Sequence, residues 1–339
     1  MKTDVEAVDG KRFYMKKLCI AVFLCVISVV IQARVSHAIE MGIMTGNEKG
    51  TYYQFGLNLQ ELMAQHGIKL KVYPSKGSIE NVYSVYKKHS TQLGIVQSDV
   101  LAFISRGQSN DTLKTVAKKI KLVLPLYNEE VHIVARKGIT DFSDLSDRRV
   151  AVGEDGSGTY LTAKLLFEVS GIKPKDVVNI GAGEALMQLK EGKIDAMFYV
   201  AGAPVKLFAQ DIKEEDNLEL LPVMDKQILD FYPRAEIPAG TYAWQDKPVK
   251  TVAVKAVLVT YDSRTGECEN VGKFARILSD NLDRLIQTGH PKWKAVDLDY
   301  TLKGWPQYDC VKKHLGTLAQ KKEPARLNPV LDAIKGMLE

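Results

Sequence analysis

The sequence has few of the residues that metal sites and enzymes most often require. It contains six histidines and four cysteines in 339 residues, and no two histidines stand at metal-ligand spacing. A Gly-x-Ser-x-Gly nucleophile elbow is missing, as are the Lys of a nucleotide P-loop and the Gly-x-Gly-x-x-Gly spacing of a dinucleotide turn. We therefore expect no metal, no cofactor and no catalytic residue, and these absences favour a binding protein over an enzyme.

Long apolar runs are also scarce. One run of 14 mostly apolar residues, Leu18–Ile31, is shorter than the roughly 20 residues that span a bilayer. The basic segment KRFYMKK precedes it, and QARVSHA follows with small residues at the positions of a cleavage site. This pattern predicts a signal peptide over residues 1–38 that is cleaved after Ala38, with either Met1 or Met15 as the start.

The mature chain has little excess charge. Without residues 1–38 it has 301 residues, with 40 basic and 38 acidic side chains and a net charge of +2. No basic patch interleaved with aromatic residues is present, so we expect no nucleic-acid partner. Two of the four cysteines leave with the signal peptide, and Cys268 and Cys310 remain. An even pair in an exported protein favours a disulfide over two free thiols.

The tripeptide Gly-Thr-Tyr occurs in two similar settings. These are GIMTGNEKGTYYQFG (42–56) and VAVGEDGSGTYLTA (150–163). In each, an apolar stretch runs into a Gly-rich turn and then into helical apolar spacing that ends at Gly67 or Gly171, which predicts strand, tight turn and helix. A helix start carries free N–H groups and partial positive charge, so these joints either form an anion site together or merely connect elements.

Short apolar strands alternate with helices along most of the chain, which predicts an α/β fold with mainly parallel sheets. Expected strands include Lys121–Leu126 and, separately, His132–Ala135. The strand-helix series restarts after about residue 130, and the stretch from 266 to 339 is mostly helical. We therefore expect two lobes, residues 39–130 with 251–339 and residues 131–250, that close on a cleft by a hinge.

Small polar residues gather at the predicted carboxyl ends of strands, where open α/β sheets bind ligands. Ser78 is also a good N-cap for the helix after it, and Asp99 could equally favour the start of its own helix. The candidate ligand-binding residues at these turns are Thr45, Gly46, Asn47, Ser75, Gly77, Ser78, Gln97, Ser98, Asp99, Gly156, Ser157, Gly158 and Thr159.

Several motifs, taken together, closely resemble those of the TAXI solute receptors, the exported binding subunits of tripartite ATP-independent periplasmic (TRAP) transporters. The resemblance covers about residues 40 to 260. One departure is Asn47, where that family usually has a second Gly; Asn also tolerates positive φ. The motifs are TG-x(3)-GTYY-x(2)-G (45–56), GS-x-EN (77–81), LGIVQSD (93–99), VAVG-x(2)-GSGT (150–159), GKIDAMF (192–198) and IPAGTY (237–242).

The resemblance implies a two-lobed periplasmic binding protein of type II topology with its ligand in the cleft between the lobes. It implies a monomer that captures a small carboxylate solute, such as glutamate or 2-oxoglutarate, and delivers it to a TRAP permease. The motifs add Gly50, Thr51 and Asn81 to the candidate site. Tyr52, Tyr199 and Tyr242 are the aromatic residues that we expect to form a wall of this site.

Four other functions are compatible with the same pattern. The chain could serve an ABC-type transporter, or a ligand sensor for a different small anion, since the same fold serves both. An enzyme on this fold would need a reactive group in the cleft. The chain could also be a surface antigen that has lost its transport role. Retained tight ligand binding would count against this function.

Overall fold

The computed structural model describes residues 39–88, 90–106, 111–262 and 267–316. The predicted signal peptide, residues 1–38, lies outside this part of the chain. No helix within the described ranges is long and apolar enough to cross a membrane.

Parallel strands with intervening helices open the chain, as the first Gly-Thr-Tyr joint predicts. We call this part, with its strands β1–β3 and helices α2–α5, the first half. Its elements are β1 (Ile39–Met44), α2 (Thr51–Gln65), β2 (Ile68–Tyr73), α3 (Ser78–Lys87), β3 (Leu93–Gln97), α4 (Ser98–Arg106) and α5 (Asp111–Lys119).

A second series of strands and helices surrounds the second joint, and we call it the second half. It contains the 3-10 turns η1 (Phe142–Leu145) and η2 (Glu214–Asp216). Its other elements are β5 (Arg149–Ala151), α6 (Gly158–Ser170), β6 (Asp176–Val178), α7 (Ala182–Lys190), β7 (Ala196–Ala201), α8 (Lys206–Asp211), β8 (Leu218–Leu220), α9 (Lys226–Phe231) and β9 (Arg234–Ile237).

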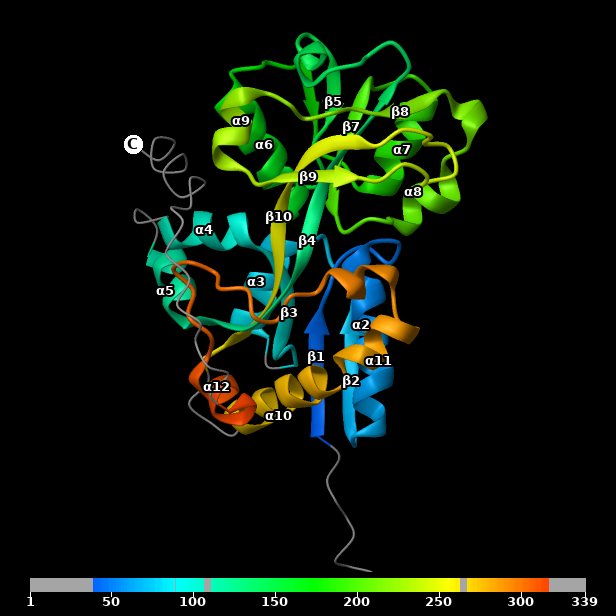
Figure 1. Ribbon diagram of the computed structural model, residues 1–339. Helices are drawn as coiled ribbons and strands as arrows, with labels where there is room; N and C mark the ends of the chain where they lie inside the picture. Colours follow the sequence, from blue (N-terminus) through cyan, green and yellow to red (C-terminus); the bar gives the residue numbers. More distant parts are fainter. Residues whose placement is uncertain (1–38, 89, 107–110, 263–266, 317–339) are drawn as a thin grey trace, which may run out of the picture. The chain divides into compact units, whose positions relative to one another are not determined.

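Two long strands, β4 (Ile120–Arg136) and β10 (Val249–Tyr261), belong to both halves. The main path of the sheet runs β2-β1-β3-β10-β4-β7-β5-β6, with β8 on β4 and β9 on β10. The pairs β1–β3, β5–β6 and β5–β7 are parallel, and every antiparallel pair whose register is known involves β4 or β10. Figure 1 shows the two strands running side by side from one half to the other.

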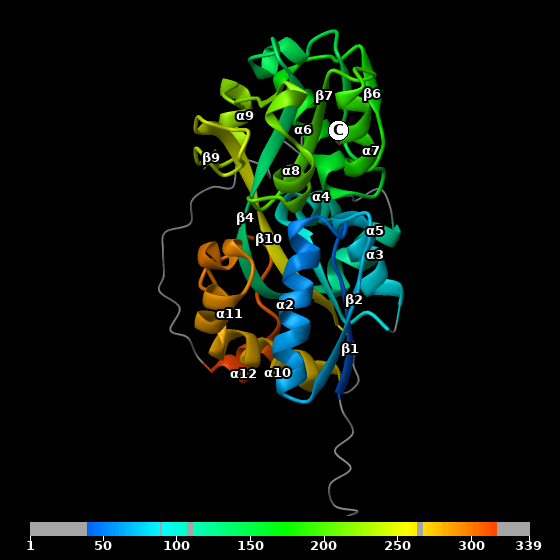
Figure 2. The same cartoon turned by 90° about the vertical axis from the view of Figure 1, so that its right-hand side faces the viewer.

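Helices cover both faces of the sheet. In Figure 2, α2 and α11 lie on one side of the first half and α3 and α5 on the other. In the second half, one buried apolar cluster joins the sheet to α6 and α9, and a second joins it to α7 and α8. The predicted α/β fold with a mainly parallel sheet in each half is confirmed. The predicted lobe boundaries remain a prediction, but the two chain passages that they require fall in β4 and at the start of β10.

The C-terminal elements pack on the first half, as expected. They are α10 (Glu267–Asp280), α11 (Leu282–Thr288), the 3-10 turn η3 (Pro291–Ala295) and α12 (Asp309–Leu315). Trp293 of η3 is fully buried and stacks on Phe55 of α2, with ring centroids 4.0 Å apart. Its indole Nε1 donates to Asn58 Oδ1 at 2.9 Å. The stacked pair therefore fixes the returning chain to the helix that follows the first joint.

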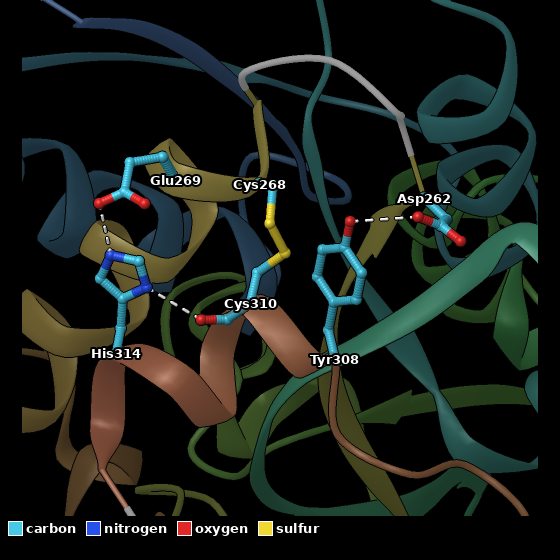
Figure 3. The surroundings of a disulfide bond; sticks show 6 residues. All are labelled: Asp262, Cys268, Glu269, Tyr308, Cys310 and His314. Atoms are coloured by element: carbon cyan, nitrogen blue, oxygen red, sulfur yellow. Dashed lines mark hydrogen bonds and ion pairs between the residues drawn. A yellow bond between two sulfur atoms is a disulfide. The ribbon is translucent and has the colours of Figure 1, made fainter.

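The predicted disulfide between Cys268 and Cys310 is confirmed. It joins α10 to α12, with the two Cα atoms 5.5 Å apart (Figure 3). His314 of α12 adds a second link, because its Nε2 lies 2.8 Å from Glu269 Oε1 of α10. The bond and the ion pair together close the C-terminal helices into one small unit.

Three local predictions were wrong. The strands expected at 121–126 and 132–135 form one continuous strand, β4, because the polar residues between them find buried partners described below. Helices α5 and α9 and the short strand β9 were not predicted. Ser78 is the first residue of α3, not its N-cap, and its Oγ accepts a hydrogen bond from Gln97 N at 3.1 Å.

Candidate functional site

Four helices begin at one cavity of about 90 Å³ between the two halves. Residues at the starts of α2 and α3 line it from the first half, and residues at the starts of α6 and α7 line it from the second half. The lining residues at these helix starts are Gly50, Thr51, Tyr52, Gly77, Ser78, Ser157, Gly158, Thr159, Gly181 and Ala182. The volume exceeds that of one water and is below the roughly 300–1,000 Å³ typical of drug-sized ligands, so the cavity suits a small solute.

The four helix starts contribute partial positive charge to this cavity. Each helix N-terminus presents N–H groups without intrahelical partners and carries about half a positive charge. The N-caps of α2, α3 and α7, which are glycines, make no side-chain capping hydrogen bond. In α6, Ser157 Oγ accepts from Tyr160 N at 3.0 Å. The arrangement can therefore bind an anion through main-chain donors.

The glycines of the two Gly-Thr-Tyr joints each pack against the opposite half. A Cβ atom on Gly50 would lie 2.6 Å from Tyr199 Oη, which belongs to β7. A Cβ atom on Gly158 would clash with Oε1 of Gln97, at the end of β3. A side chain at either position would require Tyr199 or Gln97 to shift, so glycine allows this close approach of each joint to the other half.

Polar contacts hold the halves together around the cavity. Thr51 Oγ1 of α2 donates to the Gly202 carbonyl, at the end of β7, at 2.6 Å. At the outer rim, Glu80 N donates to the Gly156 carbonyl at 3.1 Å, and Lys76 Nζ lies 3.2 Å from Glu154 Oε1. These contacts tie α2 and α3 directly to the second half.

Asp99 and Thr162 form a buried contact between the halves. Thr162 Oγ1 of α6 donates to Asp99 Oδ2 of α4 at 2.6 Å, and Val100 N donates to Asp99 Oδ1 at 2.9 Å. Asp99 is 2% exposed, and burial raises the pKa of its carboxyl to about 6, although the Thr162 hydrogen bond lowers it. Asp99 thus lies behind the cavity as a link between α4 and α6.

Glu129 of β4 lies in the lining of the cavity and is 1% exposed. Tyr52 Oη donates to its Oε2 at 2.6 Å. Among the described residues, no cationic side chain lies within ion-pair distance of Glu129. Burial therefore raises the pKa of this carboxyl well above its usual value, and the negative charges of Asp99 and Glu130 raise it further.

The neighbouring acid, Glu130, has the partners that Glu129 lacks. Lys292 Nζ of η3 forms an ion pair with Glu130 Oε1, and both side chains are buried. Ala203 N donates to the other carboxylate oxygen, Oε2, at 2.9 Å. Consecutive residues of one strand thus provide a structural ion pair and a carboxylate in the cavity.

Most of the predicted ligand-binding residues meet at this cavity. Sequence reasoning missed Glu129, and the only signal was a pair of acids inside the apolar stretch LVLPLYNEEVHIVA. The predicted residues in the lining are Gly46, Asn47, Gly50, Thr51, Tyr52, Ser75, Gly77, Ser78, Gln97, Ser157, Gly158, Thr159 and Tyr199.

The remaining candidates lie outside the lining. Asn81 Nδ2 donates to the carbonyls of Thr45 and Ile95, which holds α3 against β1 and β3. Ser98 Oγ accepts from Lys255 N at 3.1 Å and so joins α4 to β10. Asp99 makes the contact described above.

Three more candidates also have local partners. Thr45 Oγ1 donates to the Tyr73 carbonyl at 2.8 Å, and the Gly156 carbonyl accepts from α3. Tyr242 Oη pairs with His132 Nε2 at 2.9 Å and accepts from Val205 N at 3.0 Å. Burial lowers the pKa of His132 to about 4, which keeps this buried pair neutral.

A wider groove of about 1020 Å³ borders the cavity. Asn47, Ser75 and Lys76 line both, so the groove leads from the surface to the site. Its far wall is formed by α7, where Met187 is half exposed. The helix starts and the buried polar side chains converge on the smaller cavity, which makes it the candidate ligand site. Within the described ranges, no group of three or more His, Cys, Asp or Glu residues could hold a metal ion.

Comparison with known proteins agrees with this fold. The model of the NMT1-like family matches residues 43–319. A structure described as a periplasmic transporter aligns with a TM-score of 0.52 and 15% identity, over 75% of this chain and 87% of that chain. This likeness shows a shared fold.

Two further solved structures align less closely. One is the substrate binding protein of an amino acid ABC transporter, with a TM-score of 0.47 and 11% identity, over 74% of this chain and 99% of that chain. The other is a histidine kinase sensor domain with similarity to periplasmic binding proteins, with a TM-score of 0.48 and 15% identity, over 76% of this chain and 96% of that chain.

Proposed function

The chain belongs to the NMT1-like family, and from this premise we propose that it is a periplasmic receptor for a small carboxylate solute of the glutamate or 2-oxoglutarate type. The receptor captures the solute by closing its two halves and delivers it to a TRAP permease. It acts as a monomer and carries out no reaction on the solute.

The observation that carries this proposal is the convergence of four helix N-termini on one small cavity. Three of these helices have a glycine N-cap with no side-chain capping hydrogen bond, which leaves first-turn N–H groups for a solute carboxylate; in α3, Glu80 N is already bonded to the Gly156 carbonyl. Among the described residues, no arginine lines the cavity, and the one lysine of the lining, Lys76, lies at the rim beside Glu154. Main-chain donors and helix dipoles therefore supply the attraction for the anion.

Closure of the two halves is expected because each half contributes one of the two Gly-Thr-Tyr joints to the site. Gly50 and Thr51 belong to the first half, and Ser157 and Gly158 belong to the second half, so neither half has a complete set of donors. A solute that contacts both sets favours the closed arrangement by its differential affinity for it. The closed receptor would then be the form that a permease recognises.

A charge placed at the second joint tests the anion site. Ser157 is the N-cap of α6, and Asp is an equally good N-cap, so Ser157→Asp should preserve the helix. The new carboxylate would lie in the lining of the cavity and repel a solute carboxylate. We expect Ser157→Asp to weaken binding at least about a hundredfold, measured by calorimetry against a panel of C4 to C6 dicarboxylates and acidic amino acids.

Ser157→Asn is the matched control, because Asn caps equally well and adds no charge. It should keep binding within about tenfold of the wild-type affinity, and both variants should unfold cooperatively at similar temperatures. Equal loss of affinity in the two variants, or full binding by Ser157→Asp, would rule out the anion site at this joint.

A further inference from the structure

We propose that Glu129 binds an ammonium group of the solute, so that the receptor takes α-amino acids in preference to oxo and hydroxy acids of the same length. This inference rests on the proposed function, because the solute's carboxylate is taken to bind at the helix starts. It adds a second charge requirement at the same cavity.

The first support is the position of Glu129. It lines the same cavity as the helix starts, and within the described part of the chain its carboxylate accepts one hydrogen bond, from Tyr52 Oη at 2.6 Å. Tyr52 itself belongs to the first turn of α2. Tyr52 thus connects the main-chain N–H donors at the start of α2 to the carboxylate of Glu129. A solute with a carboxylate and an ammonium group on the same carbon could contact both.

The second support is the charge balance around Glu129. A buried carboxylate without a cation is costly, because desolvation is not offset by an opposite charge. The adjacent buried acid, Glu130, does have an offsetting cation. Lys292 pairs with one of its carboxylate oxygens, and Ala203 N donates to the other. Glu129 makes no ion pair of its own among the described residues: Lys292, which is paired with Glu130, lowers the pKa of Glu129 from a distance, whereas the negative charges of Asp99 and Glu130 raise it. A solute ammonium group would supply the missing positive charge.

The alternative is that Glu129 holds a proton and donates it to an oxygen of an oxo or hydroxy acid. The two possibilities differ in their proton balance if opening of the halves hydrates Glu129, because an exposed carboxylate is ionised near pH 7. Burial raises the pKa of Glu129 well above the usual value when no cation is present. Closure on an oxo acid near pH 7 should therefore take up about one proton, whereas closure on an amino acid should take up almost none.

Matched ligand sets test the inference directly. We would measure the affinity of the mature protein for alanine, pyruvate and lactate, for aspartate, oxaloacetate and malate, and for glutamate, 2-oxoglutarate and 2-hydroxyglutarate. In the set that fits the cavity, the amino acid should bind at least about tenfold more tightly than its two analogues. In Glu129→Gln, which has the same shape and can still accept from Tyr52, this preference should disappear or reverse.

Glu236→Gln is the matched control, because Glu236 is exposed on β9 and lies outside the cavity lining. It should keep the wild-type preference. Calorimetry of the wild type in buffers of different ionisation enthalpy provides a readout that does not depend on how Glu129→Gln folds. Near-zero proton uptake with the amino acid, and about one proton with the oxo acid, would support the inference.

Two outcomes separate this inference from the proposed function. If acids bind but the amino group gives no advantage, and Glu129→Gln weakens all of them equally, the role of Glu129 is overturned and the anion site remains. If no acid of any set binds to the wild type, the carboxylate site itself is wrong, and this inference falls with it.

Discussion

Asp99 gives the protein a pH dependence that can be traced to one side chain. Its pKa is about 6 in the folded protein because of burial, against about 3.9 in an unfolded chain. The folded state therefore holds the extra proton between these values. Stability from this group is fully present below about pH 4 and is lost as the pH rises through about 6.

We predict that Asp99→Asn removes this loss of folding stability at higher pH. The amide keeps the shape of the carboxyl and can still pair with Thr162 and Val100. The free energy of unfolding of the variant should exceed that of the wild type by roughly 2–3 kcal/mol at pH 7, and the difference should vanish near pH 4. Urea unfolding at pH 4, 5, 6 and 7 measures it.

Thr162→Val provides the companion measurement. The Thr162 hydrogen bond lowers the pKa of Asp99, so its removal should move the pH-dependent loss of stability to higher pH. Parallel pH profiles for the wild type and Asp99→Asn would show that Asp99 is not the group responsible.

Side-chain roles were predictable where the local sequence decides them. Gly50 and Gly158 stand in recognisable strand-turn-helix joints, and Gln97 follows a short buried run, so local patterns suffice to predict all three at the site. Glu129 could not be predicted in this way. Its hydrogen-bond partner, Tyr52, lies 77 residues away, and only the tertiary fold brings the two together.

At the scale of single elements, the C-terminal helices depend on a covalent link. The disulfide joins residues that are 42 positions apart, and α10 in turn contacts α2. Closing a loop of this length stabilises a protein by up to about 4 kcal/mol in the chain-entropy model.

We expect the double substitution Cys268→Ser, Cys310→Ser to lower the free energy of unfolding by about 2–4 kcal/mol. Solute affinity should stay within about twofold of the wild type, because neither cysteine lines the cavity. Denaturant titration and calorimetry check the two parts. An unfolding midpoint that does not respond to the substitution or to a reducing agent would contradict a stabilising role for this bond.

Strand β4 shows why element boundaries were harder to predict than element types. The polar run Asn128 to Glu130 interrupts the apolar pattern and predicted a break between two strands. In the fold, Tyr52 donates a hydrogen bond to Glu129, and Lys292 and Ala203 N bind Glu130, so the ladder continues through both acids. Strand β9 has four residues, two of them charged, and it forms because β10 offers a partner, which no local pattern reveals.

At the scale of the whole molecule, contacts across the cavity predict a closing motion. Thr51 with Gly202, and Asp99 with Thr162, are short links between the halves that an open form cannot make. We expect the solute-free protein to have a larger radius of gyration in solution than the solute-bound protein, measured by small-angle X-ray scattering. Identical scattering with and without a solute that binds by calorimetry would exclude hinge closure.

The paired strands β4 and β10 set the mechanics of that motion. They are hydrogen-bonded to each other over most of their shared length, with register shifts between Lys255 and Val257 and between Leu258 and Val259. Such irregularities bend and twist a strand pair locally. The halves are thus joined by one hydrogen-bonded strand pair that bends as a unit, instead of by two independent connections. Main-chain hydrogen bonds between the two strands would limit the direction in which the pair bends. A break in one strand would leave the halves connected by the other.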